Sequence, residues 1–404
     1  MPRMSDRPAD QYSPLYFLAS LGAGGLVVTF FMYLLFWVPH PGRPVPVFAD
    51  IAAAFEHGAW PLHLAIGVAL VGIAVMAFLN IRSLVWNLRA LAAFRGTEAY
   101  RALRRSNGET TLLAGPLAAA MSINVAFIVG LVFVPGLWGL REVLFPVALL
   151  AFMGLGAWAF RLIGDFLGRV LSGGGIFDVT AHNSFAQLLP AFAVAMIGVG
   201  LAAPAAMSAV TPTIGVSLVL STFFGVTAMI YAVVAAITGF NSMLHHGTAK
   251  EAAPTLMVIV PIVTVLGIMF MRQSHGLHTA FGTPGAPGET LIFLARLLAV
   301  EVLFLALGLL VLRRLDYAAE YLTGPRDSAG AYALICPGVA FAVLMHFFTN
   351  KGLVAAGVID KFGPAFWSLT AIAIVAQVAM IWLLAHLNRR HFGRQAAQRA
   401  GSQA

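Results

Sequence analysis

The chain has 404 residues, of which 60% are hydrophobic and only 10% are charged. Soluble domains contain about a quarter charged residues, so this composition excludes a soluble domain and indicates a polytopic membrane protein. The single cysteine excludes intrachain disulfides and cysteine-based metal or iron–sulfur sites. The net charge of +8 at pH 7 has to be located along the chain before it indicates any partner.

Ten stretches of the chain are long and apolar enough to cross a bilayer as helices of about 20 residues. The hydropathy pattern places them at 14–38, 60–82, 111–133, 143–163, 186–207, 213–238, 253–271, 290–312, 328–348 and 364–387. We therefore expect residues 14–387 to form one ten-helix transmembrane domain, with residues 1–13 and 388–404 as tails. The first apolar stretch is too long for a cleaved signal peptide, so we expect it to remain.

Four of the odd-numbered spans contain a proline within their first half. The first span has Pro14 at its very start and three glycines between residues 22 and 25 where the others have the proline. The prolines recur at intervals of about 75 residues, which is the length of a helical hairpin: Pro116, Pro190, Pro261 and Pro337. Because proline interrupts the backbone hydrogen bonds of a helix, we expect kinked helices whose freed polar groups face a common axis. The expected fold is all-α, with five helical hairpins and five inner kinked helices around a central pore.

The basic residues are distributed unevenly between the two sides of this predicted topology. Of the 24 lysines and arginines, 18 fall on the side of the termini, five on the opposite side and one inside a span. By the positive-inside rule, both termini are cytoplasmic in a cell membrane, or the inner membrane of a bacterium. Topology and contact with lipid headgroups therefore explain the positive charge, and no nucleic-acid partner is expected.

The predicted inner spans contain no Asp, Glu, Lys or Arg between the bounds given above. A pathway between them is expected to be lined by small and apolar residues with a few neutral polar groups, namely Ser122, Asn124 and Thr264. Proton-coupled pumps generally use a buried carboxylate or histidine relay, and interrupted helix ends present positive dipoles to anions. The pattern therefore favours an anion facilitator or channel.

Two charged residues, Arg296 and Glu301, lie inside the eighth predicted span. Each would cost about 3 kcal/mol if it faced lipid, so both are expected to face protein, either a neighbouring helix or another subunit, or to take part in gating or substrate binding. Five residues separate them, which puts them about 140° apart around a helix, so they are not expected to pair with each other. Arg161 and Asp165 are four residues apart and are expected to form a structural ion pair.

Among the 11 histidines, only His63 and His346 fall near the ends of predicted helices on the same side. A haem or catalytic zinc site needs histidines on facing helices with carboxylate support, which this pattern does not predict. We expect no metal, no cofactor and no enzymatic activity.

Two segments carry a resemblance to a known family. The sequences A-P-T-L-M-V-I-V-P-I-V-T at 253–264 and C-P-G-V-A-F-A at 336–342, within the ten spans, resemble the family of tellurite-resistance, dicarboxylate-transporter and plant slow-anion-channel proteins. The resemblance implies an outer ring of five helices around the inner five, a homotrimer, and a phenylalanine that plugs each pore from the ninth helix. Here Cys336 stands where that phenylalanine is expected, and Phe341 and Phe192 are the substitute gate candidates, Phe341 first.

The function expected from the sequence is passive or weakly coupled transport of small anions, such as chloride, nitrate, sulfite or a dicarboxylate, through a pore in each protomer. One alternative is a membrane subunit of an oxidoreductase that binds quinol, for which Glu301 is the candidate buried acid. Another is an oxyanion or tellurite resistance factor whose role in transport is indirect.

Overall fold

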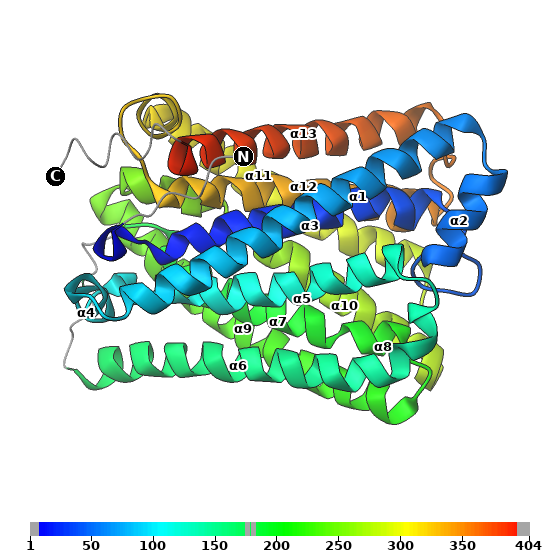
Figure 1. Ribbon diagram of the computed structural model, residues 1–404, viewed down its shortest axis with the longest axis horizontal. Coiled ribbons are helices and arrows are strands. Elements are labelled where there is room, and N and C mark those ends of the chain that lie inside the picture. Colours follow the sequence, from blue (N-terminus) through cyan, green and yellow to red (C-terminus); the bar gives the residue numbers. More distant parts are fainter. Residues whose placement is uncertain (1–7, 174–177, 179–182, 394–404) are drawn as a thin grey trace.

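The computed structural model describes residues 8–173, 178 and 183–393. These residues contain no strand, and ten of their helical spans are long and apolar enough to cross a membrane. The expected all-α polytopic fold is therefore confirmed. The spans run along the long axis of the molecule, with α4 (Glu98–Arg104) at one end and α2 (Phe48–His57) at the other (Figure 1). We call these the basic end and the α2 end.

The odd-numbered spans are composite, because each begins with a 3-10 segment at the basic end. In chain order they are η2 (Pro14–Tyr16) with α1 (Phe17–Trp37); η3 (Asn107–Leu113) with α5 (Ala114–Phe133); η5 (Phe185–Leu188) with α7 (Leu189–Leu201) and α8 (Ala203–Met207); η6 (Lys250–Met257) with α10 (Ile259–Phe281); and η8 (Ala329–Leu334) with α12 (Ile335–Phe347) and the π-helix η9 (Phe348–Val354).

The even-numbered spans are single long helices. They are α3 (Trp60–Phe94), α6 (Arg141–Ser172), α9 (Thr211–His246), α11 (Pro287–Arg314) and α13 (Pro364–Phe392). Short elements complete the described chain: η1 (Ala9–Gln11), η4 (Leu137–Leu140) and the π-helix η7 (Ala318–Leu322).

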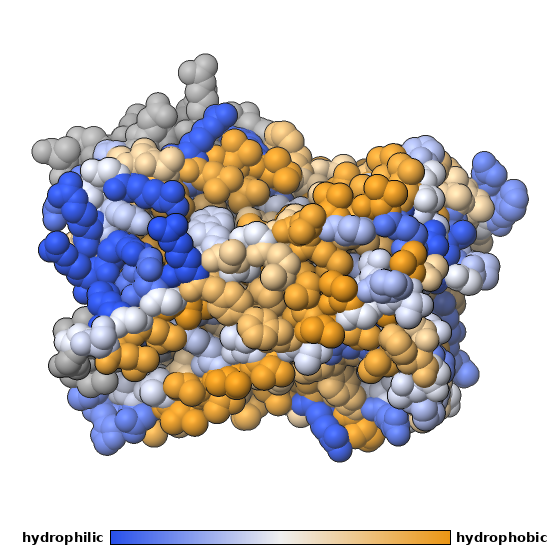
Figure 2. All heavy atoms as spheres, turned by 90° about the horizontal axis from the view of Figure 1, so that it is seen from below, coloured by the Kyte–Doolittle hydropathy of each residue, from blue (hydrophilic) through white to orange (hydrophobic). Residues whose placement is uncertain are grey.

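Burial separates the two sets of spans. Between 50 and 94% of the most apolar window of each odd-numbered span is buried, against 17 to 39% for the even-numbered spans. The odd-numbered spans are therefore inner and the even-numbered spans outer. Large apolar side chains are exposed along the outer helices, for example Val71, Leu150, Val219, Leu303 and Val375. In Figure 2 hydrophobic residues cover the middle of the visible face, and hydrophilic residues gather toward its ends, which is the pattern of a lipid-facing belt.

The prolines lie at the junction between the 3-10 and α segments and not in the middle of a broken helix. Pro116, Pro261 and Pro337 are each the third residue of their α segment, and Pro190 is the second. In the first turn of an α-helix the missing N–H has no partner to lose, so proline is tolerated there without breaking the ladder. Each proline therefore marks a change from 3-10 to α geometry near the basic end of its span.

A serine starts four of the five inner spans. The side chains of Ser13, Ser106, Ser184 and Ser328 each accept a hydrogen bond from the backbone N–H two residues later, at 3.1 to 3.3 Å. In the remaining unit the corresponding position is Ala249, which has no side-chain cap. These serines supply an acceptor to a helix start whose N–H groups otherwise have no partner.

Several helices extend beyond the hydropathy boundaries. α3 continues to Phe94, α9 to His246 and α13 to Phe392, and α10 continues ten residues past the expected end at residue 271. Hydropathy reports where the hydrocarbon ends, whereas a helix continues as long as its backbone hydrogen bonds do. This difference changes which residues belong to the inner spans.

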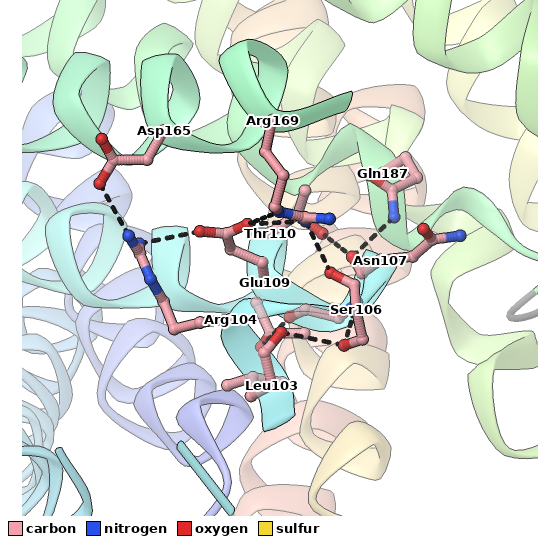
Figure 3. A network of polar contacts seen from close by, with 11 residues as sticks. Leu103, Arg104, Ser106, Asn107, Glu109, Thr110, Asp165, Arg169 and Gln187 are labelled. Carbon is pink, nitrogen blue, oxygen red and sulfur yellow. Dashed lines mark hydrogen bonds and ion pairs between the residues drawn. The ribbon is translucent and has the colours of Figure 1, made fainter. Parts of the chain in front are cut away.

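An ion-pair network fixes the basic end of the third span (Figure 3). Glu109 of η3 is 2% exposed at its side chain and pairs with Arg104 of α4 and Arg169 of α6, each at 2.8 Å. Asp165 of α6 bonds Arg104 at 2.9 Å, while Arg161 is exposed, so the expected pair of Arg161 with Asp165 is wrong. The buried carboxylate is thus compensated by two guanidinium groups, as a buried charge requires.

Candidate functional site: a central cavity

A cavity of about 840 Å³ lies between the inner spans. All five inner spans line it, and α6 and α11 contribute a few residues. The volume falls in the range of small-molecule sites and is far larger than packing defects between helices. Its lining includes exposed residues of the loop from Thr283 to Ala286, so the cavity opens at the α2 end.

The deep end of the cavity is apolar. The lining residues nearest the N-terminal ends of the five inner spans are Leu21, Met121, Phe192, Pro261 and Cys336, one from each span. Each of these residues is at most 9% exposed.

A closed layer lies beyond this ring, toward the basic end. Phe17, Leu117 and Ile335 are fully buried there in the hydrophobic core. The structure is therefore open toward the α2 end and sealed toward the basic end. An apolar constriction of this kind blocks ions because it does not hold water.

Most of the proline side chains themselves do not line the cavity. Pro261 does, whereas Pro116, Pro190 and Pro337 are buried in the packing around it. The helices that carry the four prolines all line the cavity, together with α1. The prolines thus mark the inner spans without forming the wall.

Of the three neutral polar residues expected to line a pathway, two lie in the cavity wall. They are Asn124 and Thr264. The Asn124 side chain donates to the Ala120 carbonyl at 3.1 Å. Ser122 instead is buried and donates to the Ala118 carbonyl at 2.9 Å, outside the lining.

Thr264 connects the cavity to the outer ring. Its hydroxyl lies within hydrogen-bonding distance of the Glu301 carboxyl group on α11 and 3.0 Å from the Val260 carbonyl oxygen on α10. Glu301 is 0% exposed, and its second carboxyl oxygen has no partner among the described residues. The expectation that Glu301 faces protein is confirmed.

The predicted span 253–271 ends one residue before Arg272 and so left this cation outside the inner spans. α10 continues through residue 281, so Arg272 lies inside an inner span and lines the cavity. Its guanidinium donates to the Val199 carbonyl of α7 at 2.6 Å, and no carboxylate of the described chain pairs with it. The expected absence of charge from the inner spans is therefore wrong. Arg272, His275 and Thr279 recur at helical spacing, a periodic polar face that indicates a longer helix.

Further basic groups surround the mouth of the cavity. Lys351 of η9 and His275 of α10 line it, with Glu289 of α11 as the acidic residue among the lining. Burial, and to a lesser extent the charge of Lys351, lower the pKa of Lys361 in the loop after η9. Two positive groups thus lie near enough to repel each other, which gives the mouth a positive potential.

Phe341 and Arg296 lie elsewhere than expected. Phe341 packs against the buried cluster of Ala342, Met345 and Ala373, the last on the outer helix α13, and is not part of the cavity lining, so its expected position facing the axis is wrong. Cys336 and Phe192 do line the cavity. Arg296 is exposed on the surface of α11, so within this chain it does not face protein.

The two histidines near the α2 end lie in different surroundings. His63 of α3 packs against Phe55, whereas His346 of α12 packs against Tyr33 and Trp37 of α1. In the described residues no group of three or more His, Cys, Asp or Glu side chains is arranged to hold a metal ion.

No family model, curated protein or solved structure matches the chain. The site is therefore interpreted from its own geometry.

Proposed function

We propose that this protein moves small anions across a cell membrane through the central cavity, passively or with weak coupling. The observation that carries the proposal is Arg272, a guanidinium in the cavity wall that has no carboxylate partner in the described chain. A guanidinium has five N–H donors, and the Val199 carbonyl accepts from one nitrogen, so further donors remain for a ligand. Oxyanions and carboxylates match this donor set.

The rest of the cavity supports the same class of ligand. Lys351 raises the positive potential at the mouth, which increases the local concentration of anions. The deep ring of one residue from each inner span is a gate of apolar side chains, in which Phe192 is the largest. We assign the basic end to the cytoplasm from the bias of lysine and arginine, and a homotrimer from the family resemblance alone.

Reconstituted protein tests the proposal. Purified protein in liposomes is assayed for flux of chloride, nitrate, sulfite and a dicarboxylate against empty liposomes. Arg272→Gln is expected to lower anion flux by about tenfold or more, because a hydrogen bond to a charged group contributes about 1.5–3 kcal/mol. Arg296→Gln is the matched control, since that arginine lies on an outer helix away from the cavity.

Two results would contradict the proposal. One is flux no greater than that of empty liposomes for all four anions with folded protein. The other is an equal loss in the Arg272 and Arg296 variants, which would point to a general effect of removing charge and not to a ligand contact.

A further inference from the structure

A buried acid lies directly behind the wall of the cavity, at the level of its apolar deep end. Thr264 is one turn from Pro261 on α10, and both residues line the cavity. Glu301 reaches Thr264 from α11. An acidic group in the interior of a membrane protein marks a functional site more often than a structural one.

The hydrogen bonds around Thr264 depend on the protonation state of Glu301. The threonine hydroxyl has one proton and two acceptors within reach, the Val260 carbonyl and a Glu301 carboxyl oxygen. When Glu301 is protonated, it donates to Thr264, and Thr264 donates to Val260, so both contacts are hydrogen bonds. When Glu301 is ionised, Thr264 can satisfy only one of the two acceptors.

No cation compensates an ionised Glu301. Besides Glu301, the titratable groups on α11 are Glu289, Arg296, Arg313 and Arg314, and those on the elements that pack against it are Lys250, Glu251, Arg272, His275, His278, Cys336, His346 and Lys351. None of these forms an ion pair or hydrogen bond with Glu301. The nearest cation on α10, Arg272, is eight residues from Thr264, or about 12 Å along the helix axis. A buried carboxylate without a partner is strongly disfavoured over its protonated form.

We propose that Glu301 is a proton-binding site that controls anion passage past the deep end of the cavity. This inference rests on the proposed anion transport and adds the group that makes transport depend on pH. A proton on Glu301 removes a negative charge from behind the deep end of the wall, and the chain Glu301–Thr264–Val260 is then complete. Loss of that proton places an unscreened negative charge beside the path, which repels an anion there.

Infrared difference spectroscopy of purified protein tests the proton site without any transport assay. The wild type is expected to show the carbonyl stretch of a protonated carboxylic acid, which is lost when that acid releases its proton. The band disappears in Glu301→Gln and shifts in Thr264→Val, because the bond to the threonine hydroxyl is lost. Glu289→Gln, which changes an exposed glutamate of the same helix at the cavity mouth, leaves the band in place.

Nitrate flux in liposomes tests the control of passage. Nitrate does not titrate in this range, so a pH effect belongs to the protein. Wild-type flux is expected to fall about fivefold or more from about pH 5 to about pH 9, because a unit charge within several ångströms of the path opposes the anion. Flux in Glu301→Gln stays at the acid level across the range, and Thr264→Ser retains the dependence. Glu98→Gln, which changes an exposed glutamate of α4 outside the cavity lining, behaves as wild type.

The possible outcomes separate the two proposals. Absence of a band assignable to Glu301 overturns the proton site, and a pH dependence that persists unchanged in Glu301→Gln overturns its control of passage. If the wild type carries no anion at any pH while the band is present and titrates, anion transport fails and the proton site stands.

Discussion

The inner and outer spans of this protein have similar hydropathy but lie in different surroundings. The outer helices are continuous and expose large aliphatic side chains to lipid, as those of α9 do at Val219 and Ile230. The inner spans are composite, are largely buried and begin with 3-10 segments at the basic end. An outer helix needs only to be apolar, whereas an inner span has to end in a closed layer and leave a cavity above it.

The same substitution is therefore expected to have different effects on the two sets of spans. On an outer helix a substitution among apolar residues changes a contact with fluid lipid, which adapts to it. On an inner span the neighbour is backbone or a tightly packed side chain, which does not. The contrast can be tested by matched substitutions, one where an inner span packs within the inner set and one where it meets an outer helix, or one on each set of spans.

The largest effect is expected where an inner span meets backbone. A Cβ atom added at Gly276 of α10 would lie 2.4 Å from the Ala205 carbonyl oxygen of α8, whereas one added at Gly338 of α12 would meet the flexible side chain of Met380 at 2.5 Å. Gly276→Ala is expected to destabilise the fold by about 3 kcal/mol and Gly338→Ala by about 1 kcal/mol or less. Thermal unfolding in detergent measures both. Equal destabilisation would show that the inner–inner contact is no more rigid than the contact between α12 and the outer helix α13.

The next effect concerns the gate. Phe192 lies in the deep ring of the cavity, and Phe341 faces the outer helices. Phe192→Ala is expected to raise anion flux about tenfold, because it removes the largest apolar side chain from the constriction, and Phe341→Ala to change flux less than about twofold. Flux in liposomes, with folded protein verified by size-exclusion chromatography, compares the two. A larger increase in Phe341→Ala would show that Phe341 of α12, and not Phe192, forms the gate.

The general architecture could be predicted from the sequence because its signals are long and redundant. Ten apolar spans, their alternation and the inner position of the proline-bearing helices all follow from hydropathy and from a recurring proline. The burial of Glu301 follows from the cost of a charge in lipid. The same argument predicted that Arg296 faces protein, but Arg296 is exposed in the single chain. Hydropathy does not distinguish a helix face toward lipid from one toward another subunit.

Details of the site could not be predicted because they depend on helix phase and on helix ends. Pro337 and Phe341 do share a face of α12, as their spacing predicts, but the wall of the cavity is formed by the face with Cys336, Val339 and Val343. Pro337 does not face the axis, because its side chain is buried in the packing around the cavity. Arg272 was missed because the hydropathy of α10 falls before its helix ends.

The smallest expected effect concerns the serines that start the inner spans. Ser328 accepts from the Gly330 N–H at 3.1 Å and donates to the Glu251 carboxylate at 2.8 Å, and it is 3% exposed. Ser328→Ala is expected to cost about 1 kcal/mol, since it leaves the first N–H groups of η8 without their acceptor. Ser368 of the outer helix α13 is exposed and donates only to the carbonyl of Pro364, so Ser368→Ala should change the free energy of unfolding by less than about 0.5 kcal/mol. Thermal unfolding of the two variants in the same detergent gives the difference. If the two serines proved equivalent, the caps would have no special role in the inner spans. A loss confined to Ser328 would show that the 3-10 starts depend on side chains, whereas the outer helices need only their backbone and the lipid.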